Sequence, residues 1–198
     1  MLHFHKKKQM RKMSEGKITD DSGQKRNFRT WSNISSVMIG ATLTILALIW
    51  SFSTTGGIIT SSILLLVSFS LFVNATTINE KIIYEIGKGT EEKYVNRWIS
   101  FAEYSFGLGF TLEIISFAIL GYKYIYNYLS PGDTLFSLIL PIIFLASVWC
   151  IMIIYNILNA YDKSYRFLRS AKRNTWLIIE AIALVFIILD YCGILSIN

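Results

Sequence analysis

Four carboxylates lie within long apolar stretches of this sequence: Glu103, Glu113, Glu180 and Asp190. A charged group in the middle of a bilayer costs about 2.5–3.5 kcal/mol even on a lenient scale, so such acids usually face other helices or water. No lysine or arginine lies within the same apolar stretches. Intramembrane acids relay protons, and rings of acids select cations. We therefore expect the four acids to line an ion path.

The spacing of these acids predicts two pairs at matched depths. Within each stretch the acids are ten residues apart, a heptad plus a three-residue step, which places both on one face of a bundled helix. Depths are counted from a tryptophan at the start of each stretch, with a rise of about 1.5 Å per residue. The inner tier is Glu103 with Glu180, and the outer tier is Glu113 with Asp190. In the alternative interpretation the acids are protonated and donate interhelical hydrogen bonds, which makes them structural.

The elements that must position these acids are membrane-spanning helices. Hydrophobic residues make up 53% of the 198 residues and charged residues 16%, against about 25% in a soluble domain. Five stretches approach the roughly 20 apolar residues that a helix needs to cross a bilayer, and their lack of alternation excludes barrel strands. The predicted fold is all-α, a polytopic integral membrane protein with five transmembrane helices. The spans lie near residues 32–51, 58–76, 100–121, 134–155 and 175–195.

The basic residues predict the orientation of these spans. Nine of the 19 lysines and arginines lie in residues 1–30, four in 77–98 and five in 159–174. Lys123 stands alone between the third and fourth spans. The positive-inside rule then places the N-terminus in the cytoplasm and the C-terminus outside. We expect a multi-pass protein of the plasma membrane.

The same pattern predicts the domain organisation. Residues 1–30 form a basic cytoplasmic tail, which we expect to be mobile and drawn to anionic lipid, although its bases and histidines could also contact metal or nucleic acid. Residues 31–198 form the transmembrane domain. Within it, residues 77–99 and 156–174 are predicted to be cytoplasmic helical loops, because apolar residues recur there at helical spacing.

An arginine and a tryptophan stand together at the start of the first, third and fifth predicted spans. An indole ring prefers the headgroup level and a guanidinium group prefers the phosphates. These pairs therefore predict interfacial anchors rather than a binding site. The anchoring residues are Arg29, Trp31, Arg97, Trp98, Arg173 and Trp176.

The sequence contains no motif of an enzyme, a cofactor site or a metal site. Histidine occurs only at positions 3 and 5, the two cysteines lack a CxxC spacing, and no phosphate-binding or dinucleotide-binding fingerprint is found. We therefore expect no catalytic activity, no cofactor, no metal and no nucleic-acid partner. A lipid-modifying enzyme with a metal held by Glu and Asp is the weakest of three hypotheses.

The leading hypothesis is a small oligomeric membrane channel or ion-translocating protein that passes cations or protons. Five helices leave little room for a pore within one subunit, so a homo-oligomer is expected in the lipid bilayer. The alternative is a non-catalytic membrane anchor or effector subunit. Such a subunit works with a soluble or membrane partner through its basic cytoplasmic face.

Overall fold

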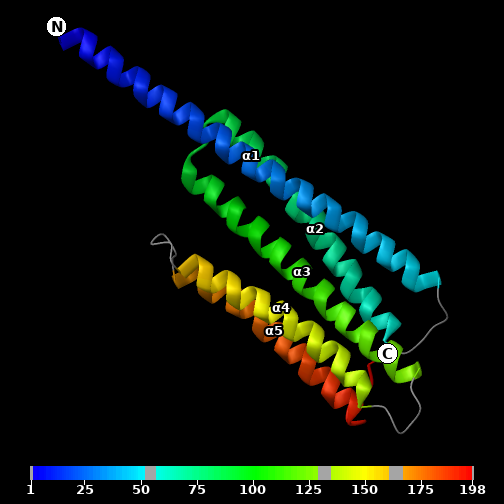
Figure 1. The fold of residues 1–198 in the computed structure, drawn as a ribbon. Helices are drawn as coiled ribbons and strands as arrows, with labels where there is room; N and C mark the ends of the chain where they lie inside the picture. The colour runs from blue at the N-terminus through cyan, green and yellow to red at the C-terminus, as the bar shows by residue number, and fades with distance from the viewer. Residues whose placement is uncertain (1, 52–56, 129–134, 161–166, 198) are drawn as a thin grey trace. The chain divides into compact units, whose positions relative to one another are not determined.

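The computed structural model describes residues 2–51, 57–128, 135–160 and 167–197, and all regular structure within these ranges is α-helical. Inside the helices, the side chains of residues 2–22, 24, 92, 155–160 and 167–174 lie outside the description. The prediction of an all-α chain is confirmed. The helices are α1 (Leu2–Ser51), α2 (Ile58–Lys88), α3 (Glu92–Tyr128), α4 (Phe136–Ala160) and α5 (Phe167–Tyr191) (Figure 1).

Four helices are long and apolar enough to cross a membrane, which indicates a membrane-embedded protein. The side chains of α5 are described only from Thr175 on, so its assignment as a fifth span stays a prediction. The orientation of the helices also stays a prediction. The four membrane-length stretches are Lys25–Ser51, Ile58–Lys88, Lys93–Tyr128 and Phe136–Ile154.

The chain divides into two compact units that cut across α1, α2 and α3. Unit 1 comprises Met1–Gly40 and Leu71–Phe106, and unit 2 comprises Ala41–Ser70 and Gly107–Asn198. The sequence prediction divided the chain after residue 30 on the basis of a membrane boundary, and that boundary stays a prediction. So does the mobility of residues 1–30, which from Leu2 onward belong to α1.

Unit 1 has its own apolar core, built from a stripe of isoleucines on α2 at a spacing of four residues. Two hydrogen bonds join its helices. Ser32 Oγ of α1 donates to Glu80 Oε1 of α2 over 2.7 Å, and Asn74 Nδ2 of α2 donates to Ser105 Oγ of α3 over 3.0 Å. The core residues are Ile78, Ile82, Ile86, Val95 and Ala102.

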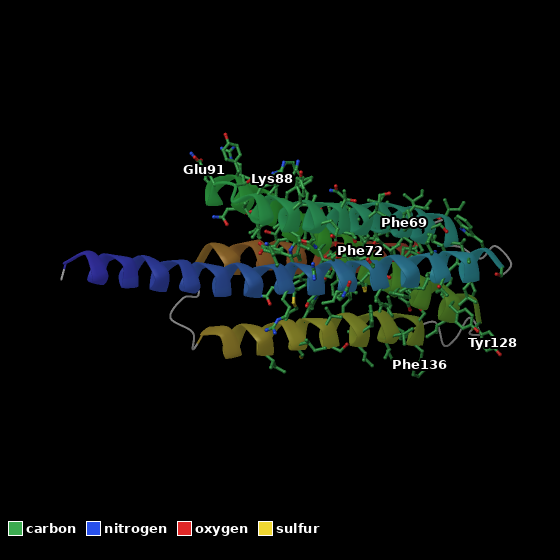
Figure 2. The ribbon with its side chains drawn as sticks, turned by 90° about the horizontal axis from the view of Figure 1, so that it is seen from above. Phe69, Phe72, Lys88, Glu91, Tyr128 and Phe136 are labelled. Atoms are coloured by element: carbon green, nitrogen blue, oxygen red, sulfur yellow. The ribbon has the colours of Figure 1, made fainter. Side chains whose placement is uncertain are left out.

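A tight turn joins α2 to α3 within unit 1, and Figure 2 shows Lys88 and Glu91 on either side of it. Gly89 adopts a φ of 74°, its N–H donates to the carbonyl of Ile86, and the next N–H donates to the carbonyl of Glu85. This is the Schellman arrangement, which needs a left-handed residue after the helix. The predicted helical loop 77–99 therefore consists of the end of α2, this turn and the start of α3.

We expect Gly89→Ala to lower the free energy of unfolding by about 1–2 kcal/mol, the cost of a left-handed conformation for a residue with a Cβ. Gly87→Ala is the matched control. Gly87 lies inside α2, where a Cβ meets nothing closer than Lys25 Nζ at 3.7 Å, and alanine favours a helix. Denaturant unfolding in detergent measures both variants, and equal losses of stability would contradict the assignment of this turn.

Unit 2 is organised around α3, which contributes five of the seven buried residues in its largest apolar cluster. Leu145 of α4 and Ile187 of α5 complete that cluster, and α4 and α5 lie side by side (Figure 1). A second cluster joins Leu46 and Ile49 of α1 to Leu65 of α2. Every helix of unit 2 therefore packs an apolar face inward, and Glu113, Glu180 and Asp190 lie among these faces.

Candidate functional site: the buried carboxylates of unit 2

Glu113 lies on the side of α3 that contacts α1. Its side chain is buried, with 4% of its surface exposed. Thr42 Oγ1 of α1 donates a hydrogen bond of 3.3 Å to Oε1. The second oxygen, Oε2, is buried and has no hydrogen-bond partner within the described part of the chain. A carboxyl group with one long hydrogen bond is poorly suited to carry a full charge in apolar surroundings.

Glu180 lies where α5 meets α3 and α4, and only 1% of its surface is exposed. The indole Nε1 of Trp149 on α4 donates to Oε2 over 2.9 Å. The hydroxyl of Thr111 on α3 donates a second hydrogen bond. Thr111 and Glu113 are two residues apart, which corresponds to about 200° around a helix axis. Glu113 therefore projects from one side of α3, and Glu180 contacts another side through Thr111.

Asp190 is enclosed by donors at the C-terminal end of α5. Lys123 Nζ lies 3.0 Å from Oδ1 and 2.8 Å from Oδ2, and the hydroxyl of Tyr122 donates to Oδ2 over 2.7 Å. The chain turns back through Gly193, whose φ is 73°, and the N–H of Ile197 donates to Oδ1 over 2.6 Å. The lysine and aspartate side chains are 12% and 4% exposed. Asp190 and Lys123 thus form a largely buried ion pair in which both carboxylate oxygens have donors.

The predicted outer tier of Glu113 with Asp190 is wrong, because Asp190 pairs with Lys123, ten residues beyond Glu113 along α3. Glu180 has its contact with α3 at Thr111. The inner tier of Glu103 with Glu180 joins residues of the two different units and stays a prediction. Asp190 has a neutralising cation, although no lysine or arginine lies within the predicted spans. Lys123 lies only two residues past the predicted end of the third span.

The error in the outer tier has a physical cause, the register of α5 along α3. A Cβ built on Gly107 would lie 2.9 Å from Nε1 of Trp176, so this indole packs directly on the backbone of α3. The prediction placed Trp176 at the level of Trp98, nine residues before Gly107, which corresponds to about 13–14 Å along a helix. The close fit of an indole against a glycine sets the register, and a common depth of tryptophans does not.

The two helices differ in how far their acids share one face. On α5, Glu180 and Ile187 are buried and Asp190 is half-buried, so the two acids share an inward-facing side of the helix, as predicted. On α3, Glu103 is exposed and Glu113 is buried, so the two acids differ in their surroundings and their shared face stays a prediction. Whether any of the four acids lies on an ion path is untested and stays a prediction.

Hydroxyl groups extend the polar contacts of α3 toward α2. Ser68 Oγ donates to the carbonyl of Gly109 over 2.7 Å. Ser61 and Ser116 exchange hydrogen bonds, each hydroxyl donating to the other's carbonyl over 3.4 and 3.1 Å. Hydroxyl-to-carbonyl bonds of this kind join helices in membranes at about 0.6 kcal/mol each. In unit 2, α3 therefore makes polar contacts with α1, α2 and α5.

The predicted interfacial anchors have different surroundings. Trp31 is exposed and meets the ring of Phe106 edge-on. Trp98 is half-buried, with Lys81 Nζ 3.8 Å from its ring centroid. Trp176 packs on α3, as described above. Arg29 and Arg97 are exposed, and the side chain of Arg173 lies outside the described residues. Contact of these residues with lipid headgroups stays a prediction.

Sequence reasoning missed the partners of the acids, namely Thr42, Thr111, Trp149, Tyr122 and Lys123. A threonine or tryptophan in a span carries no signal of its own, since both are common in membrane helices. Lys123 did carry a signal, because a lone outer cation and an aspartate near the outer end of a span are candidates for an ion pair. Among the described residues, no three His, Cys, Asp or Glu side chains come together as metal ligands.

Comparisons with family models, with curated proteins and with solved structures found no match to this chain. The function is therefore argued from the geometry of the chain itself.

Proposed function

We propose that this chain is a non-catalytic membrane subunit that holds an acidic partner protein at the membrane through unit 1. The observation that carries the proposal is the surface of unit 1, where cations lie over aromatic rings. Lys88 Nζ is 4.4 Å from the ring centroid of Tyr84, and the guanidinium of Arg97 is 5.9 Å from that of Tyr94. Both tyrosines are exposed. Tyrosine and arginine are enriched in protein interfaces, where an acidic group would complete such a pair.

The lengths of α2 and α3 support this proposal. They contain 31 and 37 residues, or about 46 and 55 Å at 1.5 Å per residue, against about 30 Å for a hydrocarbon core. The excess length leaves a helical extension with its own core, which makes the cation-bearing surface a rigid one. In the proposed topology five spans place this surface in the cytoplasm and the C-terminus outside the plasma membrane, because 18 of the 19 basic residues then lie on one side.

The test compares two pairs of tyrosines in the full-length chain. Tyr84→Ala with Tyr94→Ala removes the aromatic surface of unit 1, while Tyr124→Ala with Tyr128→Ala removes a stacked, exposed pair at the other end of α3. Extraction in mild detergent is followed by quantitative mass spectrometry of co-purifying proteins. We expect the first variant to lower recovery of one acidic partner by at least about tenfold, or 1.4 kcal/mol, and the second to leave it unchanged. Equal recovery from both variants would contradict the proposal.

Ion translocation is a second candidate, favoured by the unpartnered Oε2 of Glu113. Buried carboxyls within membrane helices are recurrent proton and ion carriers. The proposed ion path is limited to Glu113 and Glu180, because Asp190 is neutralised by its ion pair with Lys123. Glu113 projects from one side of α3, and Glu180 contacts another side. A path that joins the two acids therefore needs a second subunit, in keeping with a homo-oligomer.

Ion flux in proteoliposomes tests this second candidate. We expect Glu113→Gln and Glu180→Gln each to reduce cation or proton flux, because the amide cannot bind a proton or pair with a cation. Glu103→Gln, at an exposed position of the same helix, is the matched control and should leave the flux unchanged. Absence of flux from the unaltered protein would exclude translocation by this chain alone.

A further inference from the structure

Glu113 differs from the other buried acids of unit 2 in how far its oxygens are satisfied. Asp190 receives donors at both oxygens, among them a lysine, and can be charged where it lies. Glu180 receives an indole N–H and a hydroxyl. Glu113 receives one hydroxyl at 3.3 Å, and its Oε2 has no hydrogen-bond partner in the described ranges. An ionised carboxylate accepts about four hydrogen bonds, so Glu113 is the acid least able to hold a charge.

The charged and titratable groups around Glu113 do not change this assignment. The parts of α1 and α2 in unit 2, residues 41–51 and 58–70, contain no titratable side chain. On α3 the nearest cation in sequence is Lys123, which is engaged with Asp190. On α5, Glu180 contacts α3 through Thr111, on the other side of that helix. Tyr122 of α3 likewise donates to Asp190, while Cys150 of α4 and Cys192 beyond α5 are exposed.

The donor set also indicates which ligand this site takes. One carboxyl and the hydroxyl of Thr42 supply three oxygens, so Mg²⁺ or Ca²⁺, which takes six or more, would need at least three further ligands in these buried, apolar surroundings. A proton requires a single oxygen and removes the cost of burying the charge. From this geometry we propose that Glu113 is a buried proton-binding site, positioned by Thr42 at the contact of α3 with α1. The proposal does not depend on the docking function, and for the second candidate it names the transported ion as the proton.

A hydrophobic carbodiimide tests this proposal, because it reacts with carboxyls in their neutral form. The carboxyl proton moves to a carbodiimide nitrogen, the carboxyl oxygen adds to the central carbon, and the acyl group then migrates from oxygen to nitrogen as a stable N-acylurea. No atom leaves, and no oxidant or reductant is needed. The modified residue is identified by peptide mass spectrometry of the full-length protein in phosphatidylcholine vesicles.

We expect Glu113 to be labelled at neutral pH at least about tenfold faster than Glu103, because Glu113 is buried among apolar helix faces with a single donor, whereas Glu103 is exposed. Labelling of Glu113 should persist above the pH range in which a solvated glutamate ionises. Thr42→Val removes the donor to Oε1 and should extend the labelling to higher pH. Thr44→Val, an exposed threonine of the same helix, is the control and should leave the pH profile unchanged.

The labelling rate is measured on the unaltered protein, so the test does not require a variant that folds. Loss of Glu113 labelling over the acidic pH range in which a solvated glutamate ionises would overturn the proposal, and so would an unlabelled Glu113. Labelling of Glu113 without proton flux in the same vesicles supports the binding site and rejects translocation. The two proposals can therefore fail separately.

Discussion

Replacing Lys123 by methionine should lower the free energy of unfolding by about 3–5 kcal/mol, the cost of removing one partner from a buried ion pair. Methionine keeps an apolar stem of similar length, which matters because the Lys123 Cγ lies 2.7 Å from a Cβ built on Gly57. The expected loss of stability therefore measures the removal of the charge and not a change in packing. Asp190 would remain buried with Tyr122 and the N–H of Ile197 as donors but without a cation.

The double variant Lys123→Met with Asp190→Asn is the control for this prediction. Removing both charges leaves no uncompensated ion, so we expect it to recover more than half of the stability lost in Lys123→Met. Unfolding in detergent is followed by tryptophan fluorescence, since the chain contains five tryptophans. Simple addition of the two single losses would contradict the pairing of these residues.

Replacing Gly107 by alanine should destabilise the protein by about 1–3 kcal/mol, the usual cost of an overpacked contact. The added Cβ would lie 2.9, 3.0 and 3.1 Å from three atoms of the Trp176 indole, which is a rigid ring and cannot bend away. Either the ring or the backbone of α5 must shift. The midpoint of thermal unfolding measures the loss.

Two other glycines provide matched controls. At Gly121 the added Cβ would meet the Cδ2 of Leu140 at 2.6 Å, and this methyl group at the end of a flexible side chain can rotate away at a smaller cost. A Cβ added at Gly40 would meet no atom of another residue within 4 Å apart from the backbone of its own helix, and alanine should be neutral or stabilising there. If Gly107→Ala is as well tolerated as Gly40→Ala, then Trp176 does not pack on α3 and the observed register is wrong.

Properties that depend on neighbouring residues were predictable from the sequence. Apolar runs without alternation predict helices of membrane length, and four such helices are found. The turn at Gly89 and the buried face of α5 through Glu180 and Ile187 follow from local conformation and helical spacing, which the chain carries in its order of residues. These features need no knowledge of which helix lies beside which.

The partners of the acids could be decided only by the tertiary structure. Sliding one apolar helix along another leaves its composition and hydropathy pattern unchanged, so neither property contains the register. The register depends on steric fit, such as the Trp176 ring against Gly107, and on donors that reach an acid from another helix, such as Thr42 and Lys123. A shift of nine residues between α3 and α5 was therefore enough to separate Glu113 from Asp190, which the spacing alone had placed at one depth.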